Sequence, residues 1–437
     1  MSNNDLRIVV LGASGLIANT VAHALLDQGF FVTAVARQFS AAQKSRFGDC
    51  ALQSEIVPLH DQRLLVAIDQ ADIVLNCVGV LQGGNEHAVH LEFVQEILAR
   101  MTNTGKPQLL VHVSIPGEEE TDATSFSKTK RLAEEVIRNS SIPYVILRPG
   151  FVIAQDAYGG SALVRSIASL PIGLPDEMAA RPFQVTDIHD ISKTVCMLAQ
   201  KWTQGQRDWR GTWDVMAKEE TDLRIVISGF RNRFGGPSQR LCIPNWSLSI
   251  GARLADWVAQ LGWRPPIRST ALAELRRGVV GNPGPWIDAT GIEPRDLSEI
   301  MKALPSTVQE AWFARLYLLK SVIVVVLCIF WILSGLIALF PAYDLATGIL
   351  TDRGLPVWLA AAITIISSLM DITIGMLIAW RRTIRVGLYL GIGVSIFYMI
   401  GAAILTPEMW IEPLGALVKT GPAIILMLVA LAIDKDR

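Results

Sequence analysis

Cysteine is scarce in this sequence of 437 residues, and its arrangement excludes several kinds of site. The cysteines are odd in number, form no Cys-x-x-Cys pair and are spread along the chain: Cys50, Cys77, Cys196, Cys242 and Cys328. A disulfide framework is therefore not expected, and these residues are interpreted as packing residues in a reducing compartment. His112 and His189 also lack partners at a metal-ligand spacing, so no metal site is predicted.

The sequence likewise lacks an excess of charge of either sign. Its 39 Lys and Arg residues balance 40 Asp and Glu residues, which gives a net charge of -1. Nucleic-acid binding through a basic surface is therefore not predicted. A charged, apolar leader is also missing, because the first residues read as a strand, so the N-terminal part is not expected to be secreted.

Hydrophobic residues, in contrast, are abundant. They make up 51% of the chain, and the mean hydropathy is +0.37, which is high for a wholly soluble protein. After Arg315 come four apolar segments of about 20 residues or more, enough to cross a bilayer core of roughly 30 Å. These predicted spans cover residues 321–340, 357–380, 386–406 and 414–433.

The charges between these segments predict an orientation. Cations stand before the first segment, between the second and third, and after the fourth, at Arg315, Lys320, Arg381, Arg382, Arg385, Lys435 and Arg437. The other two connections carry Asp344, Asp352, Glu408 and Glu412, with only Arg353 as a cation. By the positive-inside rule both termini are cytoplasmic, and we expect an integral protein of a bacterial inner membrane.

Two ionisable residues fall inside the predicted spans, where charge is expensive. Asp371 lies near the middle of the second span, and Lys419 lies near the start of the fourth. One interpretation is that both face the bundle interior and approach each other around a proton or quinone head-group site. The alternative is that Lys419 extends to the interface while Asp371 is neutral and hydrogen-bonded.

The first half of the chain alternates strand-like and helical stretches, which predicts a doubly wound parallel Rossmann sheet, an α/β fold. The expected strands are residues 7–11, 31–36, 55–59, 73–78, 109–114 and 144–147. Residues 209–305 are rich in Trp, Pro, Gly and Arg and are expected to form a small substrate lobe over the carboxyl ends of the strands. Its tryptophans are interpreted as packing or interfacial residues.

A glycine turn between the first strand and the following helix predicts a dinucleotide site. Gly12 suits the tight turn, Gly15 allows a pyrophosphate to approach, and Ala18 allows close helix packing. The phosphates are expected on the helix N-terminus, where unpaired amides and the helix dipole favour negative charge. The residues expected to form this site are Gly12, Ser14, Gly15, Leu16 and Ile17.

The end of the second strand bears on which dinucleotide binds. An acidic residue there selects NAD, whereas an arginine accommodates the additional phosphate of NADP. The chain has Ala36 followed by Arg37, which favours NADP(H) over NAD(H). Asp61 is either a neighbour of the adenine or a helix N-cap.

The segment after the fifth strand resembles a known active site. VHVSIPG places Ser114 where the sheet opens, and SFSKTKRLAEE follows. Here the sequence resembles the extended and atypical short-chain dehydrogenase/reductase family, which uses a Ser or Thr after the fifth strand and a Tyr-x-x-x-Lys helix. The resemblance makes Ser114 and Lys130 the candidate catalytic residues and Lys130 a cofactor contact; the alternative is a turn residue and a solvated lysine.

Phe126 occupies the position of the family's tyrosine. In that family the tyrosine hydroxyl moves the substrate proton, with its ordinary pKa of about 10 lowered by its neighbours. Phenylalanine has no such proton. Cofactor binding is therefore expected to persist where ordinary carbonyl reduction does not.

Further motifs extend the resemblance over about the first 200 residues. NCVG resembles the loop that passes under the cofactor, LRPGFVIA resembles the segment near the nicotinamide, and FQVTDIHDIS resembles the stretch that returns to the sheet. The cofactor contacts that these motifs imply are Cys77, Val78, Gly79, Pro149 and Gly150. WFARLYLLK and the apolar segments after it, best of all residues 412–433, look like the DoxX-like membrane domain, which implies a membrane module linked to redox processes.

Together these features predict three parts and leave two functions open. The parts are a Rossmann domain at 1–200, a substrate lobe and connector at 201–314, and a four-helix DoxX-like membrane domain at 315–437. The first hypothesis is a membrane-tethered NAD(P)H-dependent oxidoreductase or isomerase acting on an apolar substrate such as a quinone or lipid-linked compound. The second is a non-catalytic NADP(H)-binding subunit or redox sensor of a membrane complex, similar to the reductase-like accessory subunit of respiratory complex I. A transporter is less favoured, and the oligomeric state is left open.

Overall fold

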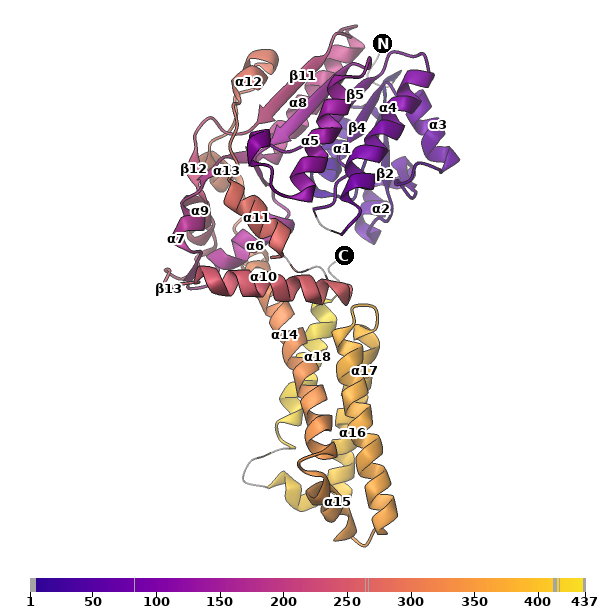
Figure 1. Cartoon of the computed structure of the whole chain (residues 1–437), viewed down its shortest axis with the longest axis vertical. Coiled ribbons are helices and arrows are strands. Elements are labelled where there is room, and N and C mark those ends of the chain that lie inside the picture. The colour runs from indigo at the N-terminus through magenta and orange to yellow at the C-terminus, as the bar shows by residue number, and fades with distance from the viewer. Residues whose placement is uncertain are drawn as a thin grey trace. The chain divides into compact units, whose positions relative to one another are not determined.

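The computed structural model describes residues 5–81, 83–263, 265, 267–411, 415 and 417–434 (Figure 1). The chain divides into two compact units. The first comprises Met1–Ala252 and Pro266–Ala314, and the second comprises Arg253–Pro265 and Arg315–Arg437.

The first unit is built on a parallel sheet of seven strands in the order β11-β6-β5-β4-β1-β2-β3. The predicted doubly wound parallel sheet is thus confirmed. The bounds are β1 Arg7–Leu11, β2 Phe31–Ala36, β3 Ala51–Gln53, β4 Ile73–Asn76, β5 Leu109–Val113, β6 Tyr144–Pro149 and β11 Arg210–Val215.

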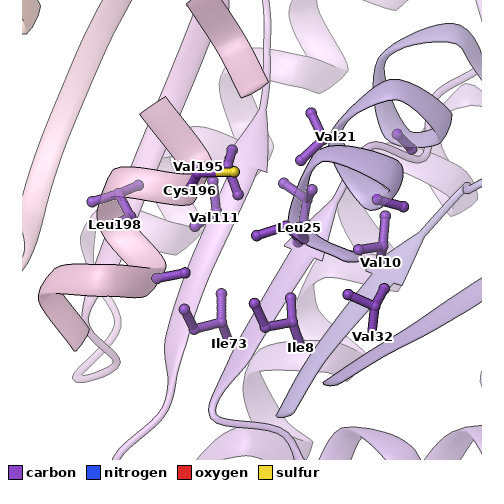
Figure 2. Packing of buried hydrophobic residues seen from close by; sticks show 14 of the residues in the cluster. Ile8, Val10, Val21, Leu25, Val32, Ile73, Val111, Val195, Cys196 and Leu198 are labelled. Carbon is purple, nitrogen blue, oxygen red and sulfur yellow. The ribbon is translucent and has the colours of Figure 1, made fainter. Parts of the chain in front are cut away.

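Helices cover both faces of this sheet because its strands are buried on both sides. Alternate residues of β1 enter different clusters: Ile8 and Val10 pack on one face, and Val9 and Leu11 on the other. The first cluster includes α1 (Leu16–Asp27) and α8 (Ile188–Thr203), and Figure 2 shows Val21 and Leu25 packing beside Val195 and Leu198. The second includes α3 (Gln62–Gln70), α4 (Phe93–Asn103) and α5 (Ser125–Arg138), and α2 (Ala41–Phe47) follows β2.

Two expectations about the strands were wrong. Residues 55–59 form no strand in the structure, and the third strand is β3, which ends before them. Ile56 and Leu59 are buried as expected of apolar residues, but Pro58 between them has no backbone N–H to donate to a ladder. Residues 210–215 were assigned to the lobe, yet they pair with β6 as the edge strand β11 of the main sheet.

The rest of the first unit consists of short elements around the carboxyl ends of the strands. Its strands form three small sheets, β10-β7, β12-β9 and β13-β8. The strands are β7 Phe151–Ile153, β8 Ile172–Gly173, β9 Pro182–Phe183, β10 Val185–Asp187, β12 Thr221–Asp222 and β13 Leu241–Cys242. The helices are α6 Gly159–Ala168, α7 Asp176–Ala179, α9 Leu223–Phe234, α10 Asn245–Gln260, α11 Ser269–Arg277, α12 Gly284–Thr290 and α13 Leu297–Ala303.

One of these helices completes the Rossmann core rather than a separate lobe. Trp286 of α12 is fully buried in the cluster of α1 and α8, and its Nε1 donates to Thr194 Oγ1 at 3.0 Å. The nucleotide-binding part of the fold therefore draws on residues well beyond position 200.

The second unit is a bundle of apolar helices. Its elements are α14 Val308–Leu339, α15 Tyr343–Thr351, α16 Val357–Ala379, α17 Ile384–Leu405 and α18 Thr420–Ile433, with the first residues of α14 belonging to the first unit. Among the described residues α14, α16 and α17 are long and apolar enough to cross a membrane. The fourth predicted span, 414–433, begins among residues 412–414 and 416, which lie outside the described residues, and α18 covers 14 residues of it.

Glycines allow the helices of this bundle to approach closely. A Cβ at Gly335 of α14 would lie 2.4 Å from Ser368 O of α16, and a Cβ at Gly375 would lie 3.0 Å from Ile332 N. Close approach at small residues is a common mode of helix association in membranes.

Candidate functional site

The β1–α1 turn has the geometry of an anion-binding loop. Gly12 adopts φ +84°, and a Cβ on it would lie 3.3 Å from the backbone of Cys77, so a larger residue is strained there. Gly12 N and Ala13 N both donate to Val35 O, which ties the turn to β2.

Among the described residues, no side chain caps the N-terminus of the helix that follows. Gly15 is the N-cap of this helix, α1, and its first turn contains no acidic residue. The amides of Leu16 and Ile17 lack intrahelical partners at such a terminus, and the helix dipole adds positive potential. Ser14 lies in the same turn, where its carbonyl accepts from Gln43 Nε2 at 3.2 Å. These residues fit the pyrophosphate of a dinucleotide.

The two residues expected near the adenosine differ in what the structure shows. Arg37 follows β2 directly and is exposed, so its guanidinium is available to a ligand. Asp61 is the N-cap of α3, where it accepts from Arg63 N at 2.9 Å and pairs with the Arg63 guanidinium at 2.7 Å. Hydrogen bonds from Arg63 hold the pKa of Asp61 well below its usual range. The capping alternative is therefore observed, and contact with adenine stays a prediction.

The loop after β4 is held by its own asparagine. Asn76 Oδ1 accepts from Val78 N at 3.0 Å, and Asn76 Nδ2 lies 3.2 Å from His112 Nδ1 of β5. Burial raises the pKa of the Cys77 thiol to about 12, so this cysteine is a neutral packing residue next to Gly12.

Lys130 joins this loop to the end of β5. It is buried on α5, and its Nζ donates to Val113 O at 3.0 Å and to Val78 O at 3.4 Å. A Cβ on Gly79 would lie 3.4 Å from the same Nζ. Burial lowers the pKa of Lys130 to about 8. An ammonium has three donors, and two of them bind carbonyl oxygens in the described part of the chain, which leaves one donor for a ligand.

Ser114 directly follows β5, at the same carboxyl end of the sheet. Its amide donates to Leu147 O at 2.8 Å. Its buried hydroxyl makes no hydrogen bond of ordinary length among the described residues, but it lies close enough to the Glu134 carboxylate to help lower the pKa of that group. The structure therefore brings together Val78, Gly79, Ser114 and Lys130, and their contact with a cofactor stays a prediction.

Phe126 lies one helical turn before Lys130, and its ring contacts a histidine that is neutral. Its ring packs edge-on against His90 at a centroid distance of 5.4 Å, where His90 belongs to η3 (Ala88–Glu92). Both His90 nitrogens are bonded, Nδ1 to Thr129 Oγ1 at 2.8 Å and Nε2 to Val80 N at 3.0 Å. Burial also lowers the pKa of His90 to about 3, so the ring is neutral.

The segment expected near the nicotinamide approaches β10 closely. Pro149 ends β6, and Gly150 N donates to Thr186 Oγ1 at 2.8 Å. A Cβ on Gly150 would lie 2.4 Å from Gln184 O, so glycine is needed for this approach.

A buried charge network that the sequence did not predict surrounds the loop after Ser114. Arg131 donates to Asp122 at 2.9 Å and to Gly117 O at 2.6 Å, and Arg277 of α11 donates to the other Asp122 oxygen at 2.7 Å. Glu134 is fully buried and bonds Arg131, Arg138 and Arg148. Burial raises the pKa of Glu134, but Arg148 and Arg131 outweigh burial and keep it below its ordinary value.

This network joins α11 to the segment between β5 and α5. Arg277 Nη1 also donates to Pro116 O at 3.1 Å, and Thr124 Oγ1 donates to Glu274 Oε1 at 2.5 Å. Asp122 and Arg277 are 155 positions apart, so no local pattern in the sequence could have paired them. We call Asp122, Thr124, Glu274 and Arg277 the α11 latch.

The two intramembrane residues are not paired with each other. Asp371 of α16 is buried and accepts from Ser334 Oγ of α14 at 3.2 Å and from Tyr398 OH of α17 at 3.0 Å. Lys419 is exposed just before α18, and among the described residues no ion pair joins it to Asp371. The first interpretation, a pair of ionisable groups, is thus not observed, whereas the hydrogen-bonded Asp371 and the exposed Lys419 agree with the alternative.

Comparisons with known proteins agree with both units. Residues 12–168 match the family model described as NAD(P)H-binding, and residues 328–428 match the DoxX-like family. The chain therefore carries an NAD(P)H-binding domain followed by a DoxX-like membrane domain. No curated protein sequence matches the chain.

Solved structures with the same fold are nucleotide-sugar epimerases and related dehydrogenases. A variant of UDP-glucuronic acid 4-epimerase from Bacillus cereus, bound to NAD, has a TM-score of 0.51 at 15% identity over 71% of this chain and 99% of its own. UDP-glucose 4-epimerase from Thermotoga maritima has a TM-score of 0.52 at 14% identity over 72% and 100%. A short-chain dehydrogenase/reductase superfamily protein from Agrobacterium tumefaciens with bound NAD has a TM-score of 0.50 at 15% identity over 72% and 99%. The predicted short-chain dehydrogenase type of fold is confirmed.

Proposed function

From an NAD(P)H-binding domain and a DoxX-like membrane domain in one chain, we propose a membrane-tethered NAD(P)H-dependent oxidoreductase or isomerase. Its substrate is an apolar compound of the bilayer, with a quinone as the first choice and a lipid-linked compound as the second. The observation that carries this proposal is the buried Lys130 ammonium at the carboxyl end of β5, where the buried Ser114 follows Val113.

Each part of the dinucleotide has residues that suit it. The amides at Leu16 and Ile17 bind the pyrophosphate, and Arg37 receives the 2′-phosphate of NADP(H). Lys130 binds the nicotinamide ribose, and Cys77 to Gly79 with Pro149 and Gly150 line the nicotinamide end. When bound, the cofactor supplies or accepts a hydride.

The absence of a tyrosine at position 126 favours a quinone over an ordinary carbonyl. Reduction of a carbonyl leaves an alkoxide, whose conjugate acid resembles water with a pKa near 15.7, so it needs an acid to protonate it. Reduction of a quinone leaves a phenolate-like oxygen, whose conjugate acid has a pKa of about 10, as in tyrosine. Ser114 can donate a hydrogen bond to such an oxygen, and no strong acid is needed at Phe126.

Phe126 also supports a second candidate function, a non-catalytic NADP(H)-binding subunit or redox sensor of a membrane complex. In that case the site holds the cofactor, and the neutral His90 and Phe126 leave it without a proton donor. The two candidates differ in turnover and not in binding.

The charge distribution supports a cytoplasmic nucleotide domain at a bacterial inner membrane. Arg381, Arg382 and Arg385 gather at the α16–α17 connection, while Asp344 and Asp352 lie at the other end of α16. Asp371 is proposed as a proton or quinone head-group contact inside the bundle, since an ionisable group at that depth is costly.

The test uses the purified full-length chain in nanodiscs. Nicotinamide fluorescence measures the affinity for NADPH and NADH, and turnover is then followed with decylubiquinone, a menaquinone analogue and a panel of carbonyl compounds. Binding with quinone turnover that Ser114→Ala lowers supports the oxidoreductase, and binding without turnover over the whole panel supports the subunit. Absence of binding of either dinucleotide overturns both. Arg37→Ala should weaken NADPH binding about tenfold and leave NADH binding unchanged.

A further inference from the structure

Helix α10 carries apolar side chains on two opposite faces. Leu248 and Ala252 are buried. Trp246, Ile250, Leu254 and Trp257 are exposed by 68, 50, 60 and 61%. At 3.6 residues per turn these four fall within an arc of about 80°, on the opposite side of the helix from Leu248 and Ala252. We call them the outer face of α10. A contiguous exposed face with two tryptophans marks an interaction surface.

The end of α10 belongs to the membrane unit. Residues Arg253–Pro265 group with the apolar helices and not with the Rossmann domain. Arg381 N donates to Leu261 O at 3.1 Å, and Trp263 Nε1 donates to Ala379 O at 2.6 Å. The Arg381 guanidinium also lies 5.2 Å from the centre of the Trp263 ring. The chain leaving α10 is thus fixed to the α16–α17 connection.

Charged residues gather at that connection, at the end of the apolar helices. Arg381 and Arg385 both bind Asp434, and Lys320 Nζ donates to Ile433 O at 2.7 Å. Asp371 is the only charged residue within α16 itself. Trp358 and the half-exposed Trp380 bracket this helix, 22 residues or about 33 Å apart, which matches a hydrocarbon core of roughly 30 Å. Tryptophan pairs at this separation are typical of the two membrane interfaces.

We propose that α10 is an interfacial helix whose outer face lies in the head-group region of the membrane that α16 and α17 cross. These observations favour phospholipid as the partner of the outer face. The chain that leaves α10 contacts the α16–α17 connection, where the membrane–water interface is expected, and exposed tryptophans suit the head-group level. Arg253 is exposed beside Trp246 and Trp257 on the helix surface, where its guanidinium can meet lipid phosphate.

Helix α10 is close in sequence to the α11 latch. Only eight residues, 261–268, separate the end of α10 from α11. Helix α11 carries Glu274 and Arg277, which hold the loop after Ser114. The interfacial position of α10 stands without the proposed function, because it depends only on exposure and contacts.

Spin labels on the full-length chain test the proposal. Ile250→Cys and Leu254→Cys place a nitroxide on the outer face, and Gly251→Cys is the matched control. Gly251 is exposed on the flank of the same helix, and a Cβ there meets nothing within 4 Å. All three are made in a Cys242→Ser background, since Cys242 is exposed, and the unsubstituted background measures residual labelling. The protein is placed in nanodiscs of phosphatidylethanolamine and phosphatidylglycerol.

Accessibility to oxygen and to a nickel chelate is then measured by power saturation. The proposal expects labels at 250 and 254 to be reached by oxygen severalfold better than by the chelate, and the label at 251 to show the reverse. Equal access of the chelate to all three positions overturns the proposal, because the outer face then lies in water. Exclusion of both reagents from 250 and 254 also overturns it, because a protein and not lipid then covers the face. Melting temperatures equal to that of the Cys242→Ser background show that the three labelled variants keep the native fold.

Discussion

Phe126 and Lys130 are separated by one turn of α5, yet only Lys130 reaches the end of the sheet. Lys130 Nζ bonds Val113 O and Val78 O, while Phe126 packs on His90. Under the proposed function, Lys130 holds the nicotinamide ribose, whereas position 126 offers no group that can move a proton.

Replacing Phe126 by tyrosine is expected to create carbonyl reductase activity or to raise it by about 10²-fold, because a positioned acid contributes that much. Affinity for NADPH should stay the same, since the ring lies on His90 and not at the phosphates. Steady-state turnover with a carbonyl panel and fluorescence titration check both expectations. Phe126→Leu is the control that changes packing without adding a hydroxyl, and a comparable gain in that variant would contradict the acid role.

Lys130 predicts a specific pH dependence of stability. Burial lowers its pKa to about 8 in the folded chain, from 10.5. Between these values the unfolded chain binds a proton at Lys130 that the folded chain releases, so the free energy of unfolding increases with pH. Lys130→Met should remove this increase. Denaturant unfolding of both forms between pH 7 and about 10.5 measures the difference, and parallel profiles would rule out a depressed pKa.

At the scale of elements, α11 is held to the loop after β5 by buried charges. Removing one partner of such a pair costs about 3 kcal/mol, because it leaves a charge uncompensated in the protein interior. Arg277→Ala is therefore expected to lower the free energy of unfolding of the first unit by about that amount. The neighbouring Arg276 is exposed, and Arg276→Ala should stay within about 0.5 kcal/mol of the parent. Equal effects of the two variants would show that the α11 latch does not stabilise the lobe.

The bundle depends on Asp371 through hydrogen bonds to two other helices. Hydrogen bonds between membrane helices contribute about 0.6 kcal/mol each, so Asp371→Leu should cost about 1 kcal/mol and Asp371→Asn less. Lys419 makes no ion pair with Asp371 in the structure, so Lys419→Met combined with Asp371→Asn is expected to be additive. Thermal melting of the parent, the two single variants and the double variant in one detergent measures whether the effects add. A coupling energy well above the experimental error would support an interaction between Asp371 and Lys419.

The boundaries of β1 and β2 and the glycine turn follow from the sequence because local patterns decide them. A β-branched run fits a buried parallel strand, and only glycine tolerates φ +84° at position 12. The failures have equally physical causes. Pro58 ends an apolar run that otherwise reads as a strand, and β11 alternates Trp213 and Val215 with polar residues, as an edge strand does. The α11 latch depends on residues 155 positions apart, which only the folded chain brings together.

At the scale of the whole molecule, the charges at the two ends of α16 predict on which side of the membrane the proposed cofactor site lies. Both ends of α16 are charged, but the signs differ: arginines follow Trp380, whereas acidic residues precede Trp358. Cytoplasmic loops of membrane proteins are enriched in Lys and Arg, and the cytoplasm is also where NAD(P)H is available. An opposite orientation would put the Rossmann domain out of reach of its cofactor.

Single cysteines on either side of α16 test this orientation. Asp352→Cys precedes the helix, and Thr383→Cys follows it. A membrane-impermeant maleimide applied to intact spheroplasts is expected to label position 352 and to reach position 383 only after permeabilisation. Cys242→Ser serves as background because Cys242 is exposed in the Rossmann unit, and its own labelling in the parent should follow position 383. If position 383 and Cys242 react in intact spheroplasts, the nucleotide site faces outward, and no cellular dinucleotide can serve it.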